Sequence, residues 1–158
     1  MYSVFDTPGD EDRGISILRS YIEFNPDDGY AHLGLAELYA RKGMQKEHVG
    51  EMEKASTLFG FPKVANEIVT AYSAFGYQAA LRAWAVGLDH YGVHRPVMVA
   101  QAYARLGERN VAFDWLERAY SERDDDMVFL NSDPVWDPLR SAPRFKDLVR
   151  RVGLPPQI

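Results

Sequence analysis

The sequence of 158 residues contains no cysteine, and this absence excludes several kinds of chemistry at once. Without thiols the chain forms no disulfide bond, no thiolate zinc site and no cysteine nucleophile. Long apolar runs are absent too, because no stretch approaches the roughly 18 to 20 residues that cross a bilayer. The opening MYSVFDTPGDEDR also lacks the basic and apolar regions of a signal peptide. We therefore expect a soluble, cytoplasmic protein with no membrane partner.

Clustered positive charge is the third feature that the sequence lacks. The chain has 18 Lys and Arg against 23 Asp and Glu, a net charge of -5, and its basic residues are scattered along the sequence. Nucleic acids demand several Lys or Arg contacts on one surface. The acidic balance also disfavours binding to acidic membranes. We expect no nucleic-acid partner.

Motifs of catalysis and metal binding are missing as well. No serine lies in a Gly-x-Ser-x-Gly context, and no glycine-rich phosphate loop occurs. His90 and His94 have a spacing that suits a metal on a helix, but Gly92 interrupts them and no third ligand is near. The acidic run 122–126 lacks the alternating ligands and central glycine of a calcium loop. We expect no catalytic residue, no metal, no cofactor and no enzymatic activity.

What the sequence does contain is a series of helical stretches. Apolar residues recur at intervals of three and four, as in Leu35, Leu38 and Tyr39, whereas the alternating runs typical of strands are absent. Clusters of Gly, Pro, Asn and Asp mark helix boundaries at residues 25–28, 60–62 and 92–96. The pattern predicts paired helices.

The helix pairs repeat along the chain. In each first helix a tyrosine is followed four residues later by a glycine: Tyr39 and Gly43, Tyr72 and Gly76, Tyr103 and Gly107. In each second helix three columns keep a spacing of 32 residues: His48, Ala80 and Ala112; Met52, Trp84 and Leu116; Ala55, Gly87 and Ala119. The tyrosine spacings are 33 and 31, which predicts a turn one residue shorter after Gly76. Gly14, Leu18 and Tyr21 indicate a partial repeat before the first full one.

This pattern resembles the tetratricopeptide repeat: an apolar residue, a small residue, Tyr, a turn Gly, then small, large apolar and small residues. The first repeat has Leu35, Ala36, Tyr39, Gly43, His48, Met52 and Ala55, and the third has Val99, Ala100, Tyr103, Gly107, Ala112, Leu116 and Ala119. The sequence departs from the pattern where His32 replaces the usual Trp, and where His48 replaces a small residue. Small residues let helix backbones approach, and large ones fill the space between repeats.

The end of the chain resembles the terminal region of repeat domains in bacterial signalling proteins. Such arrays commonly follow a DNA-binding, cyclase or kinase domain, and the resemblance covers roughly residues 60–155. Asp133 and Pro134 have the pattern of a helix N-cap and a first-turn proline. Phe145, Leu148, Val149 and Val152 form one apolar face, which predicts a capping helix. Trp136 is expected to plug the last repeat.

The predicted fold is all-α: an α-α superhelix of about three helix pairs with a flanking helix at each end. We expect a single domain over residues 1–158. Its predicted parts are a partial repeat at 11–26, repeats at about 28–60, 62–90 and 94–122, and a C-terminal cap at 126–155.

The resemblance places a peptide-binding groove on the concave face lined by the first helices. Its outward positions are Tyr30, Leu33, Glu37, Arg41, Lys63, Asn66, Thr70, Gln101 and Arg105. Arg41 and Arg105 suit a carboxylate-bearing peptide, and the alternative is that both are solvated helix arginines. The carboxylate clamp of co-chaperones needs Lys and Asn where this chain has Leu33 and Glu37, so a chaperone C-terminus is not the expected ligand.

The predicted function is a non-catalytic interaction module or scaffold that binds a protein or peptide of unknown identity in this groove, with a regulatory role in bacterial signalling or transcription. The alternative is self-association, because an incomplete first repeat leaves an apolar N-terminal edge that favours a homodimer. Tyr2, Val4 and Phe5 are candidates to cover that edge instead. A helical-repeat nucleic-acid binder and an enzyme are further, less supported alternatives.

Overall fold

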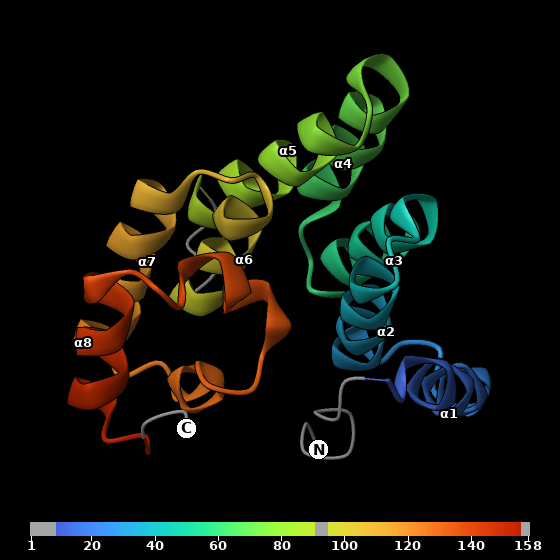
Figure 1. Cartoon of the computed structure of the whole chain (residues 1–158). Coiled ribbons are helices and arrows are strands. Elements are labelled where there is room, and N and C mark those ends of the chain that lie inside the picture. The colour runs from blue at the N-terminus through green and yellow to red at the C-terminus, as the bar shows by residue number, and fades with distance from the viewer. Residues whose placement is uncertain (1–8, 91–94, 156–158) are drawn as a thin grey trace. The chain divides into compact units, whose positions relative to one another are not determined.

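The computed structural model describes residues 9–90 and 95–155 (Figure 1). Throughout these residues the protein is all-α, as predicted, and no strand occurs in them. The helices are α1 (Glu11–Phe24), α2 (Gly29–Arg41), α3 (Gln45–Leu58), α4 (Pro62–Phe75), α5 (Tyr77–His90), α6 (Pro96–Arg105), α7 (Arg109–Glu122) and α8 (Pro143–Val152). Two short 3-10 helices, η2 (Asp125–Phe129) and η3 (Pro134–Leu139), lie between α7 and α8. The α-helices fall within the partial repeat, the three repeats and the cap that the sequence predicted.

Contacts divide the chain into two compact units, residues 1–84 (unit 1) and 85–158 (unit 2), with the boundary inside α5. The single domain over the whole chain stays a prediction.

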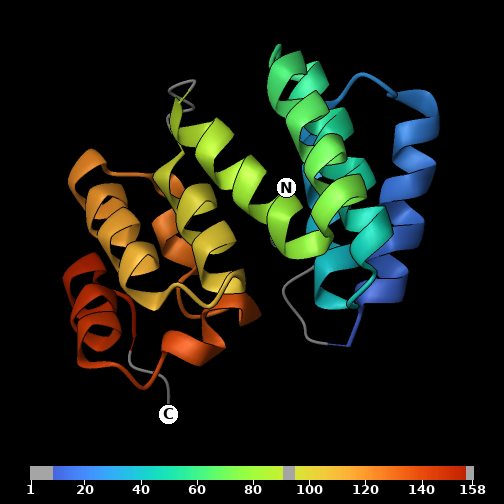
Figure 2. The same ribbon diagram turned by 90° about the horizontal axis from the view of Figure 1, so that it is seen from above.

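In unit 1 consecutive helices pack on one another: α1 on α2, α2 on α3, and α3 on α4 (Figure 2). The α1–α2 contact is built from Ile15, Leu18 and Ile22 on one side and Leu35 and Leu38 on the other. A Cβ at Gly34 would lie 3.3 Å from Leu18 Cδ1, which is a tight contact, so the two helices approach closely at this glycine. The partial first repeat is therefore a packed helix.

The columns of small and large residues occupy the core. The four alanines of the columns spaced by 32 residues are at most 1% exposed: Ala55, Ala80, Ala112 and Ala119. Met52 and Leu116 are 0% exposed, and Trp84 is 6% exposed. The spacing of 32 residues therefore marks positions where one helix packs closely on another.

The turn glycines adopt backbone conformations that other residues rarely take. Gly43, Gly76 and Gly107 have φ values of 69°, 86° and 77°. Gly76 is followed directly by α5, whereas one further residue separates Gly43 from α3 and Gly107 from α7. The middle turn is thus one residue shorter after its glycine, as the tyrosine spacings predicted.

In unit 2 the α6–α7 hairpin is closed by the cap that follows it, since η3 packs on α6 and α8 packs on α7. Asp133 begins η3, and its side chain accepts a hydrogen bond from Val135 N, with Pro134 in the first turn. Trp136, predicted to plug the last repeat, is 1% exposed. The predicted apolar face of α8 is buried at Phe145, Leu148 and Val149 and joins the same core.

Candidate functional site

Tyr30 is the aromatic residue among the predicted groove positions, and 52% of its surface is exposed to solvent. Its position is well defined because the Asp28 carboxylate accepts hydrogen bonds from the backbone N–H groups of Tyr30 and Ala31 at the start of α2. The Tyr30 ring meets the Phe59 ring edge-on, with 5.0 Å between centroids. Phe59 in turn lies so close to α2 that a Cβ at Gly29 would be 3.0 Å from its ring. An aromatic side chain is thus held in place while half of it faces solvent.

The other predicted groove residues of α2 are half-buried. Arg41 Nε donates to Glu37 Oε1 at 3.3 Å, and the Arg41 side chain is only 12% exposed. The guanidinium proposed for a partner's carboxylate is therefore already paired within its own helix. Leu33 lies one turn before Glu37.

Lys63, Asn66 and Thr70 are all exposed and share one face of α4, since they are spaced by three and four residues. The opposite face of α4 is buried through Val64 and Ile68, which are 2% and 0% exposed. The fold therefore leaves this polar stripe without a packing role.

Gln101 and Arg105, the last two residues of the predicted groove, lie on α6 in unit 2. Gln101 Nε2 donates to Asp133 Oδ2 at 2.7 Å, and Asp133 is only 6% exposed. Gln101 therefore holds the cap on α6. Arg105 is half-buried.

The segment that leads into the cap also binds the start of α6. Asp124 Oδ2 accepts a hydrogen bond from Val97 N at 3.0 Å, and Arg95 pairs with Asp126 at 3.0 Å. Burial raises the pKa of the Asp126 carboxyl, and the Arg95 charge opposes that shift. The first turn of α6 is therefore covered by the protein's own acidic segment.

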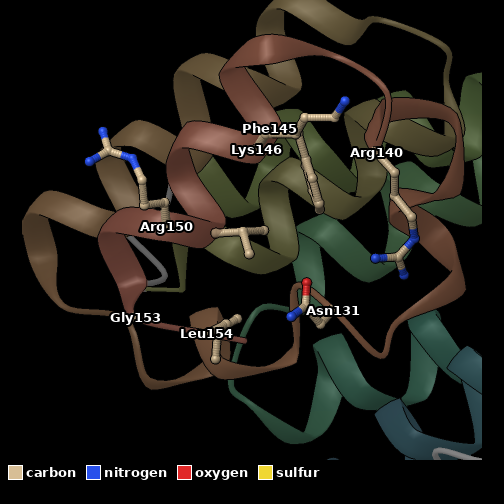
Figure 3. A pocket seen from close by; sticks show the side chains of 8 residues that line it. Asn131, Arg140, Phe145, Lys146, Arg150, Gly153 and Leu154 are labelled. Carbon is tan, nitrogen blue, oxygen red and sulfur yellow. The ribbon is translucent and has the colours of Figure 1, made fainter. Parts of the chain in front are cut away.

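Unit 2 contains a pocket that the sequence did not predict (Figure 3). Its volume is about 660 Å³, and it lies between α8, the residues that follow α8, and the loop after η2. The lining residues are Asn131, Arg140, Phe145, Lys146, Val149, Arg150, Gly153 and Leu154. We call this site the cap pocket. In Figure 3 the Phe145 side chain points toward Asn131, whereas the guanidinium group of Arg150 and the ammonium group of Lys146 point away from it.

The three cationic residues of the cap pocket differ in how far they are already bound. Arg140 donates to Asp137 Oδ1 and to the carbonyl oxygens of Leu130 and Asp133, at 2.7, 3.0 and 3.0 Å. Arg150 pairs with Asp147 at 2.5 Å, and its hydrogen bond holds the pKa of the Asp147 carboxyl below the ordinary value. Lys146 is exposed, and no residue in 9–90 or 95–155 forms an ion pair with it. Lys146 is thus the cation at the rim that remains available to an anion.

Two buried histidines in unit 1 have polar partners. His32 Nδ1 lies 2.5 Å from Glu51 Oε2, and its Nε2 lies 3.0 Å from the carbonyl oxygen of Pro26. His48 Nδ1 lies 2.7 Å from the Tyr77 hydroxyl. The sequence identified His32 as a replacement for the usual Trp of the repeat. It did not predict Glu51 as the partner of His32, because the two residues are 19 positions apart in the chain.

Within residues 9–90 and 95–155, no three His, Asp or Glu side chains are grouped so as to hold a metal ion. From the sequence we expected no metal site at His90 and His94, and His94 lies outside the described residues. Among the same residues no helix combines the length and apolarity needed to cross a membrane.

In comparisons with known proteins, no family model matched the sequence, and neither a curated protein nor a solved structure matched it with significance. The tetratricopeptide resemblance therefore stays a prediction that depends on the residues named above.

Proposed function

We propose that the protein is a non-catalytic interaction module of the tetratricopeptide type that binds a peptide or protein segment along α2 and α4. In this proposal it serves a regulatory role in bacterial signalling or transcription. The observation that carries it is Tyr30, an aromatic side chain that is 52% exposed although its backbone and ring are both held in place.

Tyrosine is enriched among the residues that contribute most to protein interfaces, because it offers a large apolar ring and a hydroxyl. A side chain that is already held in position loses less conformational entropy when a partner binds. The Asp28 cap and the Phe59 ring supply that restraint for Tyr30.

The stripe of Lys63, Asn66 and Thr70 supports the same surface with polar groups. The chain passes from Phe59 to α4 within three residues, so the start of α4 is near the Tyr30–Phe59 pair. An aromatic anchor beside exposed amide, hydroxyl and ammonium groups is the usual composition of an interface core with its rim. Arg41 and Gln101 are left out of this surface, because Glu37 and Asp133 already bind them.

The test is a selection of displayed peptides on the purified chain, followed by fluorescence anisotropy with the enriched peptides. Tyr30→Ala is expected to raise Kd about 30-fold, the effect of losing a hot-spot contact of about 2 kcal/mol. Asn66→Ala is expected to raise it severalfold. Asn66 is exposed, so the circular dichroism melt of Asn66→Ala should match that of the wild type. Tyr30→Ala loses its ring contact with Phe59 and should lower the free energy of unfolding by only about 1 kcal/mol, so this variant also stays folded.

The matched control is Phe75→Ala. Phe75 is 83% exposed but ends α4, at the opposite end of the helix from Lys63. Its removal should leave Kd within about twofold, as for a residue outside the interface. Peptides that bind Tyr30→Ala and Asn66→Ala as tightly as the wild type would refute the proposal, as would a selection that enriches no peptide.

A second candidate function is self-association through α1, which one observation favours. Ile17 and Phe24 are 44% and 83% exposed and lie seven residues apart, on one stripe of α1. Exposed apolar stripes favour pairing with a second copy. Light scattering after size exclusion tests this proposal: a dimer that Ile17→Glu dissociates supports it, and a monomer at high concentration rejects it.

A further inference from the structure

The cap pocket combines an apolar lining with one available positive charge, and it lies in unit 2, apart from the residues of the proposed peptide surface. Its volume of about 660 Å³ is within the range of small-molecule sites, roughly 300 to 1,000 Å³. Such sites are mostly apolar with a few placed polar groups.

The apolar part of the lining comes from α8 and the residues that follow it. Phe145 and Val149 belong to the face that α8 turns to the core, and Leu154 adds a half-buried aliphatic side chain. Together these three side chains provide the contact that an aliphatic or aromatic group prefers over water.

Hydrogen bonds hold the segments that form the walls of the pocket. Arg140 donates to two backbone carbonyls of the η2–η3 segment, those of Leu130 and Asp133. Asn131 Nδ2 donates to the carbonyl oxygen of Pro155 at 2.7 Å, which ties the residues after α8 to the same segment. A ligand would therefore meet a pocket whose walls are already in place, and less ordering cost would oppose its binding.

Charge decides which apolar ligand the pocket suits. The arginines of α8 have acidic partners: Arg144 pairs with Asp114, Arg150 with Asp147, and Arg151 with Glu117. Lys146 lies on the same helix and has no such partner within the described ranges 9–90 and 95–155. A single ammonium group beside an apolar lining complements one carboxylate better than a phosphate, which is usually bound by several cationic or backbone donors.

We propose that the cap pocket binds an apolar carboxylate, a ligand whose carboxylate group is joined to an aliphatic or aromatic group. The exposed Lys146 side chain turns toward the pocket and pairs with the carboxylate, and Phe145, Val149 and Leu154 contact the apolar group. The ligand is either a free organic acid or the carboxyl end of a peptide, and the two sources share this chemistry.

The experiment uses the whole chain labelled with ¹⁵N and follows backbone amide shifts during titration. The probes are 4-phenylbutyrate, its neutral amide 4-phenylbutanamide, and N-acetyl-glycyl-leucine as the peptide end. The acid is expected to shift amides of α8 and of the residues after it, and to bind about tenfold more tightly than the neutral amide, because the amide cannot form the charge-assisted hydrogen bond.

Two variants and a control assign the contacts. Lys146→Gln is expected to weaken binding of the acid about tenfold and to leave binding of the neutral amide unchanged. Leu154→Ala is expected to weaken both. Lys63→Gln removes another exposed lysine, which lies in unit 1 and outside the pocket lining, and is expected to change neither affinity. The exposed position of Lys146 makes its replacement compatible with folding.

Equal binding of the acid and the neutral amide would overturn the proposal. It would also be overturned if Lys146→Gln bound the acid as tightly as the wild type does. Binding of 4-phenylbutyrate without N-acetyl-glycyl-leucine identifies a free acid as the ligand, and the reverse identifies a peptide end. Tyr30→Ala should leave every one of these titrations unchanged, so a failure here is distinct from a failure of the proposed peptide surface.

Discussion

The buried pair of His32 and Glu51 should contribute more to the stability of unit 1 than any other polar contact described in it. The two side chains are 6% and 11% exposed, and they lie 2.5 Å apart between α2 and α3. Replacing Glu51 by Ala leaves the His32 ring buried with Pro26 O as its remaining hydrogen-bond partner. Removing one member of a buried pair costs about 3 to 5 kcal/mol, because the other loses its compensation.

This cost is large compared with a typical free energy of unfolding of about 5 to 15 kcal/mol. Glu51 also accepts a hydrogen bond from Lys54 at 2.9 Å, but the Lys54 side chain is 53% exposed. Lys54→Ala should therefore cost no more than about 1 kcal/mol. The difference between the two variants isolates the contribution of the buried contact.

The assay is urea denaturation followed by far-ultraviolet circular dichroism, for the wild type, Glu51→Ala, His32→Ala and the double variant. The double variant should lose clearly less than the sum of the single losses, because each single substitution already removes the contact between the two side chains. A loss below about 1 kcal/mol for Glu51→Ala, or strictly additive losses, would refute the reasoning.

Three other predictions concern the cap, a turn and a titration. Asp133→Ala should lower the free energy of unfolding by about 1 to 3 kcal/mol, since it removes the acceptor of Gln101 and the η3 cap, and a thermal melt measures it. Gly76 has φ 86° and ψ -169°, so Gly76→Ala should cost about 1 to 3 kcal/mol in urea denaturation. Asp126, whose pKa burial raises, should titrate above 3.8 in a carbon-detected NMR experiment. Because the folded state then binds the proton more tightly than the unfolded state, this group adds stability as pH falls through its pKa.

Gly50→Ala is the control for Gly76→Ala, and each of the three predictions has an outcome that would contradict it. Gly50→Ala lies in a helix with open space around its Cβ and should stabilise slightly, by about 0.5 to 1 kcal/mol. A Gly76→Ala variant as stable as Gly50→Ala would contradict the backbone argument. An unchanged melt for Asp133→Ala would show that Gln101 does not hold the cap, and the raised pKa of Asp126 is wrong if its carboxyl titrates at or below 3.8.

Helix positions and their spacing followed from the order of residues alone. Gly43, Gly76 and Gly107 end first helices because a positive φ is cheap only for glycine, which is a local property of the chain. The column of Met52, Trp84 and Leu116 could be predicted because residues that are buried at equivalent positions of successive helices recur at regular intervals in the sequence. The apolar face of α8 was predictable for the same reason.

The candidate sites were less predictable because they depend on contacts between distant residues. Tyr30, Asn66 and Thr70 were assigned to exposed positions, and they are exposed. Gln101 was assigned to the groove, yet Asp133, 32 residues later, binds it. Helical periodicity indicates which face a residue lies on but does not indicate which other segment covers that face.

The amino-acid order thus specified the helices, their turns and the residues that pack between them, because these follow from backbone preferences and apolar periodicity. Folding in three dimensions added the His32–Glu51 contact, the Gln101–Asp133 hydrogen bond that holds the cap on α6, and the cap pocket with Lys146 in its lining. The physical reason is that hydrogen bonds, ion pairs and cavities depend on side-chain positions to within about an ångström, whereas the sequence encodes such long-range positions only through the packing of the whole unit.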